Sequence, residues 1–435
     1  MSDWLTLPML AAEISQRKEE GCLVDDLEAR VAALGGQASA GDLLQVWAEV
    51  ETRVPSPSFP YREPSDLESI RRERPLGPRQ LTLALSPAEL LDRVYGAWLG
   101  RCAGCLLGKP VEGWSRARIR KVLEHAGAYP LADYFPWIDD PPTDADYRAR
   151  PRNWFRGSID HMVRDDDMDY PVLGLKLLES RGQDFTSADV AQNWLTSLPY
   201  LLVYTAERVA YRNLVLGLQP PASAAYRNPF REWIGAQIRA DIWGYVAPGN
   251  PELAAEYAFR DAAVSHVKNG IYGEMLFAAM IAASFVTSDL EEIIRIGLSE
   301  IPEKSRLAEA VRNTVKWCKE EPDWERALDR VLAEYGHYHR VHTINNAAIT
   351  IVGLMYSDLE LGPAICRTVM GGEDTDCTGA TAGSIIGAMR GARALPGTWT
   401  SPLNDRLQSS VVGMTENRIS DLAARTVKAA GRALD

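Results

Sequence analysis

The sequence has no long apolar run. Its first residues include Asp3 and no basic stretch ahead of an apolar segment, so the pattern of a secretory signal is missing. Nowhere do about 18 apolar residues follow one another, and no transmembrane helix is therefore expected. Both absences favour a cytoplasmic protein with no membrane partner.

Cysteine and histidine are scarce, with six of each. The cysteines are scattered, which excludes a disulfide framework and favours a reducing compartment. Cys102 and Cys105 form the only CxxC, so we interpret them as small residues of a packed helix. His337, His339 and His342 lie in a polar stretch that favours an exposed turn over a zinc site. The chain also lacks a P-loop and a strand followed by GxGxxG, which leaves kinase or dehydrogenase chemistry without support.

Positive charge is in deficit, because 47 Lys and Arg face 59 Asp and Glu for a net charge of −12. Such a chain repels the nucleic-acid backbone, and unspecific nucleic-acid binding is not expected. What remains is a globular composition, with 46% hydrophobic and 24% charged residues. The 435 residues suffice for one large domain or two ordinary ones.

Helix signals recur along the chain, whereas the sustained alternation typical of strands is absent. Ser86, Pro87 and Glu89 form a capping box with proline at the first helical position, which predicts a helix running to about Gly108. Further start signals begin at Ser65, Thr186 and Ser288. These patterns predict an all-α fold. A proline-rich stretch at 55–64 is typical of a linker, so we expect a helical extension over 1–85 and a main domain over 86–435.

Two segments carry a glycine at every fourth position. The glycines are Gly96, Gly100, Gly104 and Gly108 in the first ladder, and Gly379, Gly383, Gly387 and Gly391 in the second. A glycine inside a helix costs up to about 1 kcal/mol relative to alanine, so each ladder needs a compensating gain. Residues four apart share a helix face, and glycine there permits close backbone approach. The ladders therefore predict two buried, tightly packed helices, which pack either against other neighbours or against each other.

Carboxylates cluster beside these ladders. They are Glu112 after the first ladder, Asp374 and Asp376 before the second, and Asp165, Asp166, Asp167 and Asp169 before another helical stretch. A helix N-terminus favours negative charge, but one cap needs only one carboxylate. Several oxygen donors without interleaved His favour a hard cation such as Mg²⁺, Mn²⁺ or Ca²⁺ over zinc.

Four blocks, in order, resemble the ADP-ribosylglycohydrolase family. They are GAWLGRCAGCLLGKPVE from Gly96, RDDDMDYPVLGL from Arg164, SHVKNGIYGEM from Ser265 and GGEDTDCTGATAGSIIGA from Gly371, and the resemblance spans roughly residues 86–400. It implies a compact orthogonal bundle of helices with a binuclear Mg²⁺ site, in which Mn²⁺ can substitute. The implied reaction is hydrolysis at the ribose C1″ of ADP-ribose derivatives, protein-linked or small.

The same resemblance assigns the site residues. The metal positions match Asp165, Asp166, Asp374, Asp376 and Cys377, with a shift of one onto Asp167 as an alternative. Glu112 would line or gate the site, and Asp166 or Asp374 would act as general base towards water. By analogy with the family, the substrate pocket would be lined by Asn269, Gly270, His266, Tyr272 and Gly372. Trp243, Tyr245 and Tyr272 are candidates for stacking on a base, with burial in the core as an equal alternative.

Three residues depart from the family pattern. Arg164 and Asp167 stand where threonines commonly flank the paired aspartates, and Cys377 stands where a hydroxyl is usual. Two alternatives therefore stay open: a hydrolase of a small nucleoside-like glycoside, and a non-catalytic ADP-ribose-binding protein. A carboxylate-bridged di-iron bundle has little support, because only Glu334 and His337 form a Glu-x-x-His pair.

Overall fold

The computed structural model describes residues 5–34, 38–142 and 146–434. It confirms the all-α fold, with one short antiparallel pair of strands, β1 (Arg406–Gln408) and β2 (Glu416–Arg418), that the sequence did not predict. None of the described helices is both long and apolar enough to cross a membrane.

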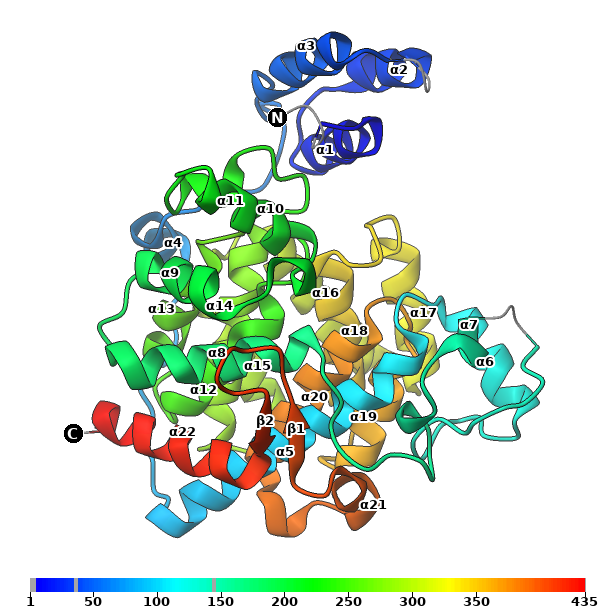
Figure 1. The fold of residues 1–435 in the computed structure, drawn as a ribbon, viewed down its shortest axis with the longest axis vertical. Coiled ribbons are helices and arrows are strands. Elements are labelled where there is room, and N and C mark those ends of the chain that lie inside the picture. Colours follow the sequence, from blue (N-terminus) through cyan, green and yellow to red (C-terminus); the bar gives the residue numbers. More distant parts are fainter. Residues whose placement is uncertain (1–4, 35–37, 143–145, 435) are drawn as a thin grey trace.

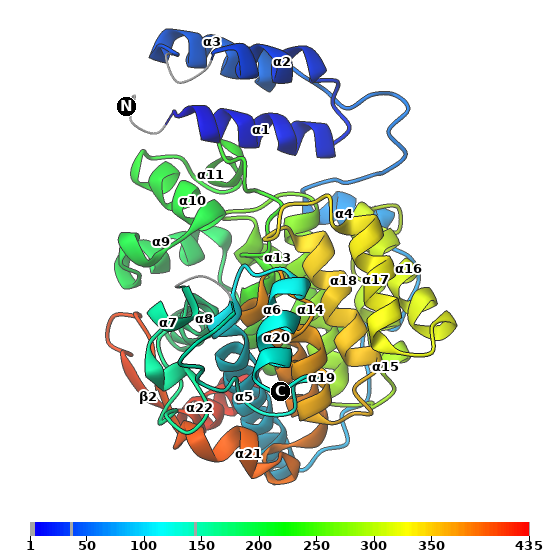
Figure 2. The ribbon, with the colours of Figure 1, turned by 90° about the vertical axis from the view of Figure 1, so that its right-hand side faces the viewer.

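The helices form a small N-terminal layer and a large bundle (Figures 1 and 2). The N-terminal segment contains α1 (Leu7–Glu19), α2 (Asp25–Leu34), α3 (Ala40–Glu51) and α4 (Leu67–Glu73). The first half of the bundle contains α5 (Pro87–Gly108), α6 (Arg116–His125), α7 (Asp146–Ala149), α8 (Asp166–Arg181), α9 (Ser187–Ser197), α10 (Thr205–Val215), α11 (Ala222–Ala225), α12 (Ala240–Val246) and α13 (Pro251–Ala262). The second half contains α14 (Asn269–Ser284), α15 (Leu290–Leu298), α16 (Arg306–Glu320), α17 (Trp324–Tyr335), α18 (Thr343–Met355), α19 (Leu361–Val369), α20 (Thr375–Arg390), α21 (Gly397–Thr400) and α22 (Ile419–Leu434).

Two of the four predicted helix starts are confirmed, and the other two helices begin one residue later than predicted. Capping boxes open α5 at Ser86 and α9 at Thr186. At the other two signals the cap is the aspartate one residue later: Asp66 caps α4 and Asp289 caps α15. Ser65 is instead occupied in a tertiary contact, because its hydroxyl accepts a hydrogen bond from the backbone N–H of Lys268.

The two glycine ladders pack against each other. A Cβ atom at Gly100 would overlap the carbonyl oxygen of Gly383, and one at Gly104 would overlap that of Gly379. The pairing runs in opposite directions along α5 and α20, so the C-terminal end of α5 meets the N-terminal start of α20. Backbone contacts backbone along this seam. This close packing is the gain that offsets the energetic cost of glycine inside a helix.

A single methyl group in this seam tests the packing. We expect Gly104→Ala to lower the free energy of unfolding by about 3 kcal/mol or more, because rigid backbone cannot yield to the added Cβ. The matched control is Gly431→Ala, since Gly431 is also helical but its Cβ would meet no atom within 4 Å. Urea denaturation should show the control unchanged or more stable by about 1 kcal/mol. Equal effects of the two substitutions would contradict the seam.

The N-terminal segment has a core of its own. Leu10, Val46 and Trp47 of α1 and α3 are buried in a cluster separate from the main core. Ile70 of α4 belongs to the main core, so the change of core falls within the linker after α3. In Figures 1 and 2, α1 to α3 form a layer at the top of the molecule, and α1 is the helix nearest the bundle.

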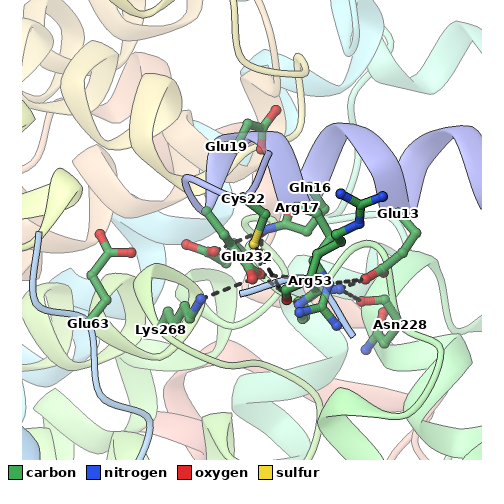
Figure 3. A network of polar contacts seen from close by, with 12 residues as sticks. Glu13, Gln16, Arg17, Glu19, Cys22, Arg53, Glu63, Asn228, Glu232 and Lys268 are labelled. Carbon is green, nitrogen blue, oxygen red and sulfur yellow. Dashed lines mark hydrogen bonds and ion pairs between the residues drawn. The ribbon is translucent and has the colours of Figure 1, made fainter. Parts of the chain in front are cut away.

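Buried ion pairs attach α1 to the bundle (Figure 3). Arg231 pairs with Glu13 at 2.6 Å and with Glu20 at 2.8 Å, and its side chain is only 6% exposed. Lys268 adds a second cation at 3.0 Å from Glu20. Gln16 donates a hydrogen bond of 2.8 Å to Glu232. Ion pairs therefore contribute to the contact between the layers. Each buried carboxylate of α1 needs a cation of the bundle to offset its desolvation, and each cation needs its carboxylate.

Removal of Arg231 should be costly, because it leaves two buried carboxylates without their main cation. We expect Arg231→Met to lower the free energy of unfolding by about 3–5 kcal/mol. Arg30→Met is the control, because the Arg30–Glu49 pair is more than a third exposed and such pairs contribute about 1 kcal/mol or less. A loss as small as that of the control in urea denaturation would refute the role of Arg231.

Candidate active site

The acidic residues meet where three helix ends converge. The C-terminal end of α5 continues into a short 3₁₀ turn, Lys109–Val111, beside the N-terminal ends of α8 and α20. A Cβ at Gly108 would overlap the backbone of Thr375, and the Thr375 hydroxyl donates to the Gly108 carbonyl at 2.8 Å. The glycine seam therefore sets the distance between these ends. Both helix N-termini favour the carboxylates placed there.

A tight turn before α20 places Glu112 beside the aspartates. Gly372 has a φ of +80°, and its missing Cβ would lie 2.6 Å from the carbonyl oxygen of Trp114. The N–H of Gly113 donates to the carbonyl of Glu373 at 2.8 Å, and the N–H of Glu373 donates to that of Trp114 at 2.9 Å. Gly372 therefore holds the segment after α5 against the start of α20.

Three overlapping groups within the described residues could each hold a cation. In each group the possible ligand atoms lie within 4.8 Å of one another. The groups are Glu112 with Asp374 and Asp376, Asp167 with Asp376 and Cys377, and Cys105 with Asp165 and Asp167. Glu112 is exposed while the other members are buried, so the centre opens to solvent at Glu112.

Burial and mutual repulsion disfavour the charged forms of these carboxylates. Desolvation, with the charge of Glu112 adding to it, raises the pKa of Asp374 to about 7. The same causes raise the pKa of Asp376 well above its ordinary value. Asp165 differs: although burial opposes its charge, the ammonium of Lys109 lowers its pKa. Without a cation, Asp374 therefore exchanges its proton near neutral pH, and the charged form of Asp376 is disfavoured.

This proton makes the stability of the metal-free chain depend on pH. Asp374 titrates at about 7 in the folded state against an ordinary value of 3.8, so between these values the folded chain binds a proton that the unfolded chain has released. The free energy of unfolding therefore falls as pH rises through this window. For protein treated with a chelator, we expect the Asp374 contribution to fall by roughly 1 kcal/mol between pH 6 and 7.5.

Urea denaturation at both pH values measures this change, and Asp374→Asn should flatten the dependence. The control is Asp421→Asn, because Asp421 is an exposed aspartate in the first turn of α22. The same slope in the wild type and Asp374→Asn would rule out the raised pKa.

Comparison with known proteins identifies the family. The sequence model of the family described as ADP-ribosylglycohydrolase matches residues 86–433. The chain belongs to the ADP-ribosylglycohydrolase family. A solved structure titled "ADP-ribosylglycohydrolase-related protein complex" is similar, with a TM-score of 0.50 and 18% identity over 79% of this chain and 99% of that one. At that identity the likeness concerns the fold. A search of curated protein sequences finds no match.

Membership of the ADP-ribosylglycohydrolase family suggests a hydrolase acting on ADP-ribosyl-type substrates. The structure brings together four of the five residues matched to the family's metal positions, namely Asp165, Asp374, Asp376 and Cys377, and places Glu112 with Asp374 and Asp376. Asp166 belongs to none of the three groups, whereas Asp167 belongs to two of them. Asp165 is the N-cap of α8 and its side chain accepts from the N–H of Asp167. Successive helical residues point about 100° apart, so Asp166 leaves the first turn of α8 in a different direction from Asp167. Two of the three groups therefore contain Asp167, the alternative named above, in place of Asp166.

Arg164 points away from this centre. Its guanidinium pairs with Asp169 at 2.7 Å and donates to the carbonyl of Leu202. Asp169 also accepts hydrogen bonds from the backbone and hydroxyl of Ser410. Arg164 and Asp169 thus anchor the segment after β1 to the start of α8, which is a structural task.

The residues predicted to line the substrate pocket are placed in a different environment. His266, Asn269 and Tyr272 are fully buried. Asn269 donates to Glu63 at 2.8 Å and to Glu232 at 2.7 Å, and the Tyr272 hydroxyl donates to the carbonyl of Pro64. The N-terminal linker lies against α14, so the hydrogen bonds to Glu63 and Pro64 lead to the linker, and the bond to Glu232 also leads away from the acidic centre. Figure 3 shows Glu63 and Glu232 below α1 in this region.

The remaining pocket candidates are also enclosed. A Cβ at Gly270 would lie 2.6 Å from the carbonyl oxygen of Arg231, so Gly270 permits a backbone contact. Trp243 stacks on Phe185 with ring centroids 4.9 Å apart, and the Tyr245 hydroxyl shares a hydrogen bond of 2.6 Å with Ser384. The core alternative fits these aromatics.

The structure adds three residues that sequence reasoning did not assign to the site. Lys109 makes a buried ion pair with Asp165, and Arg101 lies 3.6 Å from Asp167. Cys105 joins Asp165 and Asp167 in one group. Arg101, Cys105 and Lys109 each follow a ladder glycine and repeat every fourth residue, so they share one face of α5 beside the seam. This spacing of four residues was the feature of the sequence from which the three residues could have been predicted to lie together.

Proposed function

We propose that this chain is a metal-dependent glycohydrolase that cleaves the C1″ ribosyl bond of an ADP-ribosylated or related N- or O-ribosyl substrate with water. The observation that carries the proposal is the convergence of Glu112, Asp374 and Asp376 within 4.8 Å at the start of α20. Membership of the ADP-ribosylglycohydrolase family supports the reaction class.

These three carboxylates fit a hard cation, Mg²⁺ with Mn²⁺ as a substitute, because all of their donors are oxygens. Such an ion, when bound, supplies charge that orients and acidifies the attacking water. The Oδ1 atom of Asp167 is buried without a hydrogen-bond partner, which marks unused acceptor capacity next to this group. The family resemblance implies a second ion near Asp165 and Asp167, the half of the centre that also holds Lys109.

The chain's own residues account for the proton in this proposal. The water oxygen forms a bond to C1″ while the bond from C1″ to the leaving nitrogen or oxygen breaks, and the electron pair departs with the leaving group. Asp374, one of the two candidates for the general base, takes the proton from water. Glu112, at the exposed edge, lies where the substrate enters. The leaving group takes up a proton from solvent and is released, and Asp374 returns its proton to solvent.

The test measures ADP-ribose released from ADP-ribosylated protein, and ribose released from small ribosyl glycosides, in the presence of Mg²⁺. We expect Asp374→Asn and Asp376→Asn each to lower kcat/KM by at least about 100-fold, because lost site carboxylates weaken metal binding and catalysis. The control is again Asp421→Asn, which changes an exposed aspartate in the first helical turn of α22.

The other outcomes separate the alternatives. Release from small glycosides alone points to a nucleoside-like substrate. Binding of ADP-ribose without release from any substrate would turn the chain into a reader of ADP-ribose and overturn the proposal. Unchanged activity in both Asp→Asn variants would remove the acidic centre from the mechanism.

A further inference from the structure

The acidic centre has two unequal halves. In the first half, Lys109 contacts the carboxylate of Asp165 directly, and their side chains are only 11% and 2% exposed. The ring of Trp154 lies on another side of the ammonium, 4.7 Å from its nitrogen. An ammonium group enclosed in this way is a fixed positive charge inside the centre.

A second cation borders the same half. The guanidinium of Arg101 lies 3.6 Å from Oδ1 of Asp167 and also donates to the backbone carbonyl of Asp167. It is fully buried and shares its charge with Asp241, at 2.6 Å. The ammonium of Lys109 thus neutralises Asp165, while Arg101 serves Asp167 and Asp241 together.

The second half has no direct ion pair of this kind among the described residues, and Lys109, Arg150 and Arg340 act on the charge of Glu112 only from a distance. Among the residues that the structure describes, no Lys or Arg forms an ion pair with Glu112, Asp374 or Asp376. All three donors of this half are carboxylate oxygens, whereas the groups that contain Asp167 also contain the thiol of Cys105 or Cys377. Carboxylates are the ligands that Mg²⁺ prefers, and thiols are not.

We infer that Lys109 takes the place of one of the two cations, so that this chain holds a single divalent ion at Glu112, Asp374 and Asp376. The inference rests on the proposed function, which needs an ion at that group. Its physical basis is charge: a divalent ion beside the buried ammonium would meet strong repulsion in a medium of low dielectric constant. It would also add charge to a carboxylate that is already neutralised.

Lys109 then has a defined task. Its ammonium gives one positive charge that does not dissociate, and it holds Asp165 in place at the N-cap of α8. A lysine side chain is a compact point charge with three donors, so it replaces the charge of an ion without its open coordination positions. In this inference the lysine ammonium occupies the half of the centre at Asp165, and a divalent ion binds in the half formed by Glu112, Asp374 and Asp376.

The experiment counts bound metal directly. Metal-free full-length protein is titrated with Mn²⁺ alone, and the bound ion is quantified by calorimetry and by electron paramagnetic resonance. We expect one Mn²⁺ per wild-type chain, with the spectrum of an isolated ion. We expect Lys109→Met to bind two, with the spin coupling of ions about 4 Å apart. Lys109→Arg is the matched control, because it keeps the positive charge and should still bind one.

Each outcome decides. Two ions in the wild type would overturn the inference and leave the proposed function intact. No Mn²⁺ binding in the wild type would overturn both. A single ion in a folded Lys109→Met protein would show that Lys109 does not occupy the second position. If Lys109→Met fails to fold, the wild-type count and Asp374→Asn remain as the test, and Asp374→Asn should lose the one ion.

Discussion

The seam of backbone contacts between α5 and α20 is the constraint on which the rest of the structure depends. Glycines of the two helices meet from Gly96 and Gly387 at one end to Gly108 and Thr375 at the other. Because no side chain separates the helices, their relative position is fixed by atoms that cannot change rotamer. The acidic residues of the centre lie at the end of α5, at the start of α20 or at the start of α8. Helix α8 packs beside α20. The accuracy of the centre follows from the stiffness of its support.

The parts of the molecule that could be predicted from the sequence are those that depend on local patterns. The ladders, Ser86 at the start of α5 and the acidic residues are local patterns, and local patterns determined the helices and the groups of carboxylates. The choice between Asp166 and Asp167 was not local. It depends on the direction in which α8 leaves its cap at Asp165, and that direction is set by tertiary packing.

The substrate pocket was the hardest part to predict, because the N-terminal segment intervenes. Asn269 and Tyr272 lie within a block that resembles the ADP-ribosylglycohydrolase family, and nothing in that block reveals that Glu63 and Pro64 lie against them. The linker is about 200 residues away along the chain, so only the folded structure brings the two together. Lys109 was overlooked for a different reason: beside Pro110 it has the appearance of a helix end, and its partner Asp165 is 56 residues away.

The buried ion pairs between α1 and the bundle make the charge balance of the family-matched segment depend on the residues before it. Arg231 and Lys268 lie within residues 86–433, but Glu13 and Glu20, which neutralise them, lie before that segment. Arg306 likewise depends in part on Glu63. A chain that began at residue 86 would uncover these cations as a positively charged face on an otherwise acidic molecule. The N-terminal segment therefore supplies the counterions of the bundle. The buried cations of the bundle are fully neutralised only when this segment is present.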